Sequence, residues 1–131
     1  MMRVNHKAIT RAFGGKLLVR ASLQRYVIRV VAKLPNKLIG KITRFCWFLG
    51  SVDDAWAYTF RGDEIKGTNL IILSDSLLDQ SHEDIEWTIL HEIGHVILGH
   101  HNSILVTQTR QEIRRQEREA DAFAMKYLCF D

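Results

Sequence analysis

The residues with the clearest chemical potential lie within the run His91-Glu92-Ile93-Gly94-His95. On a helix, side chains four residues apart project from the same face, so the imidazoles of His91 and His95 can reach one metal ion. Glu92 points about 100° round the helix, off the metal but beside a water bound there. This is the spacing of zinc hydrolases, in which the glutamate is the general base. The alternative is a pair of histidines at the surface end of a core helix.

A catalytic zinc ion needs a third protein ligand and an open position for water. Two residues compete for the third place: His101, ten residues after His91, and Glu117, 26 residues after it. The metzincin proteases place a histidine where His101 stands, but Gly99 comes one residue too late for their turn. Glu117 and Asp121 fall on the apolar stripe of an expected helix over 107–128, with Ile113, Ala120, Ala124 and Leu128. Carboxylates buried there need a partner, and a metal with its histidine supplies one. Glu119, about 200° round the helix from Glu117, is expected on the solvent side.

Two longer segments extend this pattern. The first is His91-Glu92-Ile93-Gly94-His95-Val96-Ile97-Leu98-Gly99-His100, and the second is Glu117-Arg118-Glu119-Ala120-Asp121-Ala122-Phe123-Ala124. Together they resemble the gluzincin metallopeptidases, and most closely the small ImmA/IrrE group, whose second helix carries Glu-x-x-Ala-Asn/Asp-x-Phe-Ala. Residues 70–77 are also similar to the strand and loop before the active-site helix of that group. The resemblance covers roughly residues 65 to 128 and does not extend to the first 52.

The resemblance implies a role for each residue of the site. His91, His95 and Glu117 would be the zinc ligands, and Glu92 would be the catalytic base. Asp121 would accept a hydrogen bond from the far nitrogen of a ligand imidazole and fix its tautomer. The implied activity is zinc-dependent hydrolysis of peptide bonds in a protein, with a regulatory protein as a candidate substrate.

A peptidase also needs a donor that stabilises the oxyanion formed at the scissile carbonyl. The sequence offers four residues for this role or for a further substrate contact, and it does not choose among them: His82, His100, His101 and Tyr127. For each of them the alternative is an ordinary surface residue.

Helices and strands must position these residues. Helical periodicity is expected over 6–33, in two pieces because of Gly14 and Gly15, and over 36–41 after the only proline, Pro35. Two further helices are expected, from Ser81 to a stop at Gly99 and over 107–128. The predicted fold class is α+β, a single-domain minimal zincin-like fold with an active-site helix and a second helix that carries the glutamate.

Aromatic and β-branched runs predict three short strands, at 45–49, 55–60 and 69–73, which form a small antiparallel meander. The third strand is made of Asn69, Leu70, Ile71, Ile72 and Leu73. If it lies at the edge of the sheet beside the zinc, an extended peptide would bind by adding a strand to it. We therefore expect it to be the substrate-binding edge strand.

Charge divides the chain into two regions of one domain spanning 1–131. Residues 1–52 hold 11 basic side chains and no acidic one, whereas residues 53–131 hold 7 basic and all 15 acidic ones. The first is expected to be a basic, helical region and the second the metallopeptidase core. The basic stripe is either a solvated helix face or a docking surface for an acidic partner. It lacks the interleaved aromatic and glycine-rich pattern of single-strand binders, which argues against nucleic acid.

The cellular compartment is expected to be the cytoplasm. Cys46 and Cys129 lie far apart, which is typical of buried, reduced thiols rather than of a disulfide framework. No apolar run reaches the ~18 residues that a membrane span needs. Two other function classes remain open at this point: a zinc-binding regulatory or interaction module with little intrinsic activity, and a basic nucleic-acid-binding factor.

Overall fold

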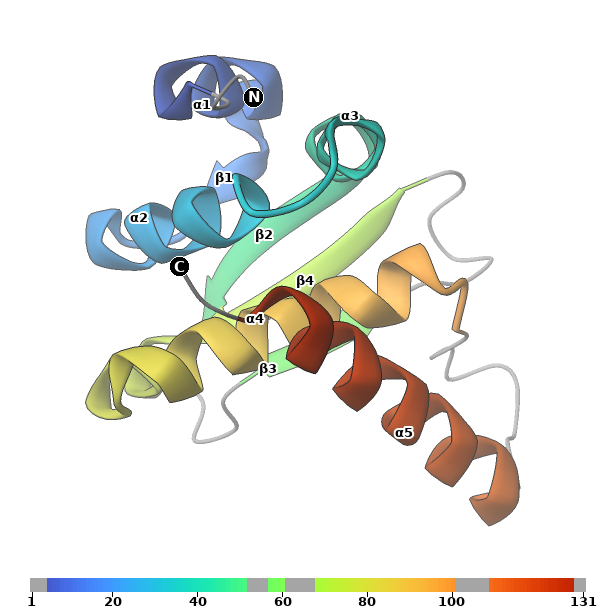
Figure 1. The fold of residues 1–131 in the computed structure, drawn as a ribbon. Coiled ribbons are helices and arrows are strands. Elements are labelled where there is room, and N and C mark those ends of the chain that lie inside the picture. Colours follow the sequence, from blue (N-terminus) through green and yellow to red (C-terminus); the bar gives the residue numbers. More distant parts are fainter. Residues whose placement is uncertain (1–4, 52–56, 61–67, 101–108, 129–131) are drawn as a thin grey trace.

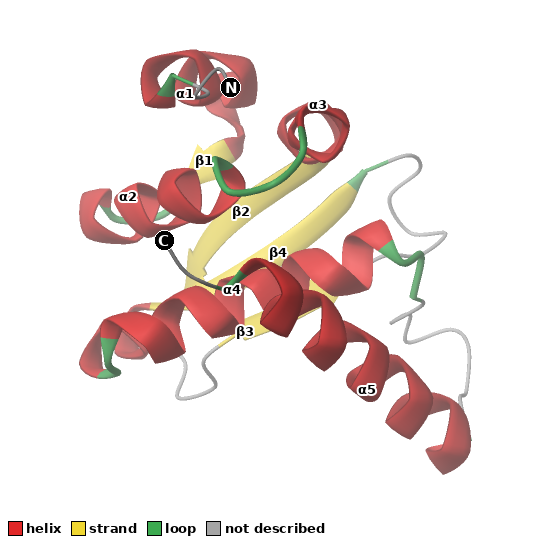
Figure 2. Cartoon of the chain, in the orientation of Figure 1, coloured by secondary structure: helices red, strands yellow, loops and turns green. Residues whose placement is uncertain are grey.

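The computed structural model describes residues 5–51, 57–60, 68–100 and 109–128. Within these residues five α-helices and a four-stranded sheet form an α+β fold, as expected (Figure 1, Figure 2). The helices are α1 (His6–Phe13), α2 (Ala21–Val31), α3 (Asn36–Phe45), α4 (His82–Ile97) and α5 (Arg110–Tyr127). The strands are β1 (Leu17–Leu18), β2 (Cys46–Ser51), β3 (Ala57–Phe60) and β4 (Asn69–Ser74). Short 3₁₀ turns cover Gly14–Lys16 and Asp75–Asp79.

The N-terminal helices follow the breaks in the sequence. The helical region divides at Gly14, whose φ of 61° lies in the left-handed range that glycine adopts without strain. Pro35 directly precedes α3, because its fixed φ suits the start of a helix. α3 continues to Phe45, beyond the predicted end at residue 41, and the two-residue strand β1 was not predicted.

The predicted antiparallel meander is wrong, because the sheet is mixed with the strand order β1-β2-β4-β3. Among the described strands, β2 runs parallel to both β1 and β4, whereas β3 pairs antiparallel with β4. After β2 the chain first forms the outer strand β3, and then returns to form β4 between β2 and β3. Alternation of apolar residues shows that a segment is a strand, but it carries no information about the strand's neighbours or direction.

The same order corrects the prediction of the edge strand. Residues Leu70 to Leu73 pair with β2 on one side and with β3 on the other. Their backbone groups are therefore already used in the sheet, and a peptide cannot add to them. Among the described strands, β3 forms the edge of the sheet next to β4.

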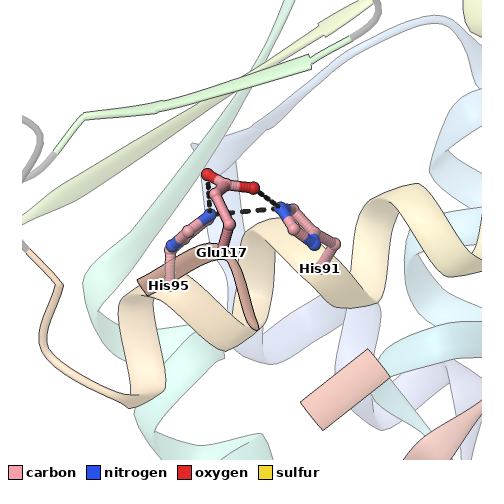
Figure 3. A group of neighbouring side chains, drawn as sticks. All are labelled: His91, His95 and Glu117. Carbon is pink, nitrogen blue, oxygen red and sulfur yellow. Dashed lines mark hydrogen bonds and ion pairs between the residues drawn. The ribbon is translucent and has the colours of Figure 1, made fainter. Parts of the chain in front are cut away.

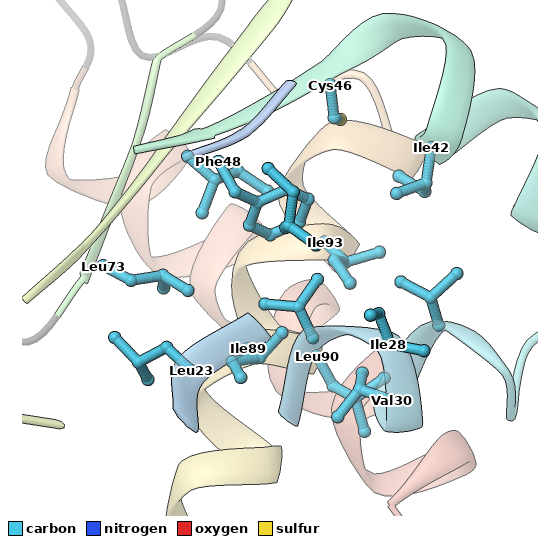
Figure 4. Packing of buried hydrophobic residues seen from close by; sticks show 14 of the residues in the cluster. Leu23, Ile28, Val30, Ile42, Cys46, Phe48, Leu73, Ile89, Leu90 and Ile93 are labelled. Carbon is cyan, nitrogen blue, oxygen red and sulfur yellow. The ribbon is translucent and has the colours of Figure 1, made fainter. Parts of the chain in front are cut away.

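The core lies between one face of the sheet and the helices (Figure 4). Cys46, Phe48 and Leu73 point from the strands toward Ile89, Leu90 and Ile93 of α4, and all six are fully buried. Leu23, Ile28 and Val30 of α2 and Ile42 of α3 close the cluster from the N-terminal side. The histidine-bearing helix α4 is thus anchored by its apolar face, which leaves its other face free for chemistry.

Ion pairs join the basic N-terminal region to the acidic half of the chain. Glu86 of α4 is buried, with 8% of its surface exposed. Its carboxylate pairs with Lys33 and, at 3.4 Å, with Arg29, both from the basic N-terminal region. A further, exposed pair joins Arg20 to Asp75 at 3.7 Å. Part of the charge asymmetry is therefore neutralised inside the molecule.

Cys46 is a buried, free thiol, as predicted, while Cys129 lies outside the described residues. Burial raises the pKa of the Cys46 thiol to about 12, with Lys41 acting weakly in the opposite direction, so the reactive thiolate is suppressed. In the described part of the chain, no helix is long and apolar enough to cross a membrane.

Helices α4 and α5 approach closely at Gly94. A Cβ at this position would lie 3.1 Å from both Cβ and Cδ1 of Phe123. Because the Cβ of Phe123 is fixed to the backbone, α5 itself would have to move to relieve the contact. Gly94 therefore sets the distance between the two helices.

Replacement of Gly94 by alanine is expected to lower the free energy of unfolding by up to about 2 kcal/mol. Overpacking costs roughly 1–3 kcal/mol, and the better helix propensity of alanine returns up to about 1 kcal/mol. Gly40→Ala in α3 is the matched control, because a Cβ there would meet nothing within 4 Å, and it should stabilise the protein. Urea denaturation measures both changes. Equal stabilisation by the two substitutions would show that α5 is not held at this contact.

Candidate metal centre

The candidate metal centre begins with two well-capped helices. The Ser81 side chain accepts a hydrogen bond from the Asp84 amide at 3.1 Å, which starts α4 where the sequence predicted. Thr109 and Glu112 form a reciprocal capping box at the start of α5. His91 and His95 project from α4 toward Glu117 on α5 (Figure 3). Capping and close packing thus bring together residues far apart in the sequence.

Three side chains converge on one point between these helices. The Nε2 atoms of His91 and His95 lie 3.2 Å apart. The Glu117 carboxylate places one oxygen 2.9 Å from His91 Nε2 and the other 3.3 Å from His95 Nε2. Both histidine side chains are 13% exposed, while that of Glu117 is 52% exposed. The group is therefore open to solvent on the Glu117 side.

This donor set fits a zinc ion. Bonds of about 2.0–2.1 Å in a tetrahedral arrangement place neighbouring ligand atoms about 3.3–3.4 Å apart. The two Nε2 atoms, 3.2 Å apart, are close to that spacing, and the Glu117 carboxylate reaches each of them with a different oxygen, at 2.9 and 3.3 Å. Two imidazole nitrogens and a carboxylate are also ligand types that zinc prefers. The group could therefore hold a metal ion.

His91 is fixed from two further sides. Its ring stacks on Trp87, with centroids 4.9 Å apart and planes inclined by 27°. Its Nδ1 lies 2.9 Å from an oxygen of Asp121, where the resemblance implied that this carboxylate would be. The ring N–H of His91 does not line up with an acceptor among the described residues, so this close contact is mainly electrostatic.

His95 lies in surroundings that keep it neutral. The pKa of His95 is lowered to about 4, chiefly by burial and also by the neighbouring His91 and His100, whereas Glu117 acts in the opposite direction. A neutral imidazole retains the lone pair that a metal ligand needs. The environment of His95 therefore favours metal binding over protonation.

His95 also contacts His100, which the sequence offered as a candidate oxyanion donor or substrate residue. Its Nδ1 lies 2.8 Å from Nδ1 of His100, and Nε2 of His100 lies 2.7 Å from an oxygen of Glu119. The His100 side chain is only 6% exposed. Both of its ring nitrogens are engaged, which leaves it no ring nitrogen with which to donate to an oxyanion.

The sequence predicts Glu119 on the solvent side of α5, because it places Ile113 and Glu117 on the buried face. The structure instead buries Gln116, Ala120, Phe123 and Ala124, and Ile113 is exposed. At 100° per residue, Glu117 and Glu119 flank this stripe on opposite sides, so both can reach groups of α4. The spacing of Phe123 and Tyr127 relative to Ala120 was the signal that could have identified the true face.

The other candidate substrate residues do not join the group. Tyr127 lies ten residues after Glu117, roughly 15 Å along the helix axis, and its ring packs on Phe123. His82 stacks edge-on against Tyr26 and lines a separate hollow of about 460 Å³. His101 lies outside the described residues. Glu92 is buried beside His91 on α4.

Residues 82–130 match the model of the family described as Peptidase U49. The matched stretch contains α4, α5 and every residue of the three-ligand group. The match supports a peptidase function. No curated protein and no solved structure matches the chain. Zinc dependence, the gluzincin type and the resemblance to the ImmA/IrrE group stay predictions.

The metal-free protein should lose stability as the pH falls from 6.5 toward 4. In this interval unfolded His95 takes up a proton, whereas folded His95, with its lowered pKa, does not. Its contribution to the free energy of unfolding is fully present above pH 6.5 and declines below it. Urea denaturation of the metal-free protein and of His95→Gln at both ends of the interval measures this. Identical losses in the two proteins would contradict the assignment.

Proposed function

We propose that this protein is a zinc-dependent metallopeptidase of gluzincin type that hydrolyses peptide bonds in a protein substrate. His91, His95 and Glu117 are the proposed zinc ligands, and Glu92 is the proposed catalytic base. One observation supports the proposal: His91, His95 and Glu117 offer ligand atoms that lie within 4.8 Å of one another, inside the segment that matches a peptidase family model.

The ligand set suits catalysis better than a purely structural role. Structural zinc sites use four protein ligands, whereas three protein ligands leave one position open for water or substrate. The half-exposed Glu117 marks the side on which the group meets solvent. A substrate carbonyl can approach from that side while the histidines stay anchored in α4.

Glu92 is the proposed proton carrier. It follows His91 directly in α4 and is only 8% exposed. When bound, zinc would polarise the scissile carbonyl and lower the pKa of a water molecule at the open position. Glu92 would accept a proton from the attacking water and donate it to the leaving amine as the peptide bond breaks. Asp121 lies 2.9 Å from Nδ1 of His91 and is proposed to orient its ring.

The substrate class follows from the peptidase function, and its regulatory nature rests on the resemblance alone. The basic residues of the N-terminal region that are not paired with Glu86 or Asp75 remain a proposed docking surface for an acidic partner. A cytoplasmic location is likewise a proposal, and it rests on the sequence features given above.

Zinc content tests the ligand assignment. Wild-type protein should bind zinc stoichiometrically, Glu117→Gln should lose most of it because one anionic ligand is gone, and His101→Ala should retain it. Atomic absorption on dialysed proteins measures the content. Release of zinc by His101→Ala but not by Glu117→Gln would show that the third ligand is misassigned.

Replacement of Glu92 by glutamine should lower peptidase activity by about 10²–10⁴-fold, because the amide cannot accept the proton of water. Zinc content should be unchanged. Hydrolysis of fluorescently labelled casein measures the activity of both proteins at equal zinc loading. Undiminished hydrolysis by the variant would remove Glu92 from the mechanism. Stoichiometric zinc without any hydrolysis by the wild type would instead support a zinc-binding interaction module.

A further inference from the structure

We propose that Glu119 and His100 are positioning residues that fix the tautomer and orientation of His95. Glu119 acts on His100, and His100 acts on His95, so that the Nε2 lone pair of His95 faces the metal position. The inference rests on the proposed zinc site. It assigns a role to two residues that are not themselves among the three proposed ligands.

The turn after α4 is built to place His100 against His95. The His100 amide donates to the His95 carbonyl at 3.0 Å, and the Gly99 amide donates to the Val96 carbonyl at 3.2 Å. With Gly99 at a φ of 72°, these two bonds form a Schellman motif. In this motif the residue after the glycine folds back onto the side chain one turn before the helix end. Here that side chain is the candidate ligand His95.

The hydrogen bonds then determine, one residue after another from Glu119 to His95, which ring nitrogen carries a hydrogen. An ionised carboxylate only accepts, so Glu119 requires a hydrogen on Nε2 of His100, 2.7 Å away. In neutral His100 the other nitrogen, Nδ1, is then an acceptor. His95 must donate to it from Nδ1 across 2.8 Å, which leaves Nε2 of His95 without a hydrogen. That nitrogen is the one 3.3 Å from Glu117.

Burial makes this arrangement specific. His100 is 6% exposed, so water cannot freely replace either of its partners, and a buried ring nitrogen without a partner is costly. The Glu119 carboxylate is 47% exposed and reaches inward from the flank of α5. His91 has a carboxylate of its own, Asp121, on the other flank. A different acidic residue of α5 therefore stands behind each candidate histidine ligand: Asp121 lies directly beside His91, and Glu119 reaches His95 through His100.

Zinc affinity tests the first part of the proposal. Partners of metal-bound histidines typically contribute 10–100-fold to affinity. We expect about 10-fold weaker zinc binding for Glu119→Gln, because an amide can donate as well as accept and no longer dictates the tautomer. His100→Leu should lose about 10–100-fold, while His100→Gln, which keeps an acceptor, should lose less. Competition with a chromophoric chelator measures all of them.

Glu112→Gln is the matched control. It removes the same charge from α5, but Glu112 contacts Thr109 in the capping box, a role that glutamine also fills. Its zinc affinity should equal that of the wild type. A loss as large as that of Glu119→Gln would reduce the effect to net charge and overturn the proposal.

Nitrogen-15 NMR of the histidine rings in metal-free protein gives a readout that a merely structural role would not move. Wild-type His95 should carry its hydrogen on Nδ1, and Glu119→Gln and His100→Leu should shift it toward a mixture with Nε2. An unchanged His95 tautomer in folded variants would overturn the inference. This measurement needs no zinc, so it separates the two proposals: absence of zinc binding by the wild type would defeat the zinc site alone.

Discussion

The structure depends on the close approach of α4 and α5 at Gly94 and Phe123. One helix carries the histidines and the other carries the carboxylates, so neither helix alone contains a metal site. The space that the absent Cβ of Gly94 leaves to Phe123 brings the backbones near enough for a glutamate to meet both imidazoles. Gly94 is thus a spacer within the His-x-x-x-His pattern, and its small size matters for the geometry as much as the histidine spacing.

Electrostatics reinforce this packing at two levels. Around the proposed zinc position, Glu117 faces both Nε2 atoms, while Asp121 and Glu119 approach from opposite flanks of α5. A cation at the centre would offset this concentration of acidic groups. Further along α4, Glu86 meets Lys33 and Arg29, which ties the basic N-terminal region to the helix that carries the histidines. The separation of charge along the sequence is therefore partly resolved by contact in the fold.

Features that depend on local periodicity could be predicted from the sequence, and those that depend on long-range pairing could not. The spacing of His91 and His95 specifies one helix face, and Ser81 and Gly99 specify the ends of that helix. The direction of β2 and the interior position of β4 arise from a crossover that apolar alternation does not encode. The predicted buried face of α5 was wrong because it included Ile113, which is exposed in the structure. That error concealed Glu119, whereas the Gly99 turn already contained the signal for His100.

The packing of α5 on α4 would couple metal binding to the stability of the fold. Residues 110–115 of α5 are exposed, and the helix projects from the body of the molecule at that end (Figure 1). Gln116 is the first buried residue, so Glu117 lies at the point where α5 begins to pack. A ligand that binds only the folded state stabilises it in proportion to the logarithm of its concentration over its dissociation constant. Zinc held between Glu117 and the histidines would therefore fasten the first packed turn of α5 to the most buried helix. The exposed N-terminal third of α5, residues 110–115, has no comparable attachment among the described residues, so it is held in place through that turn.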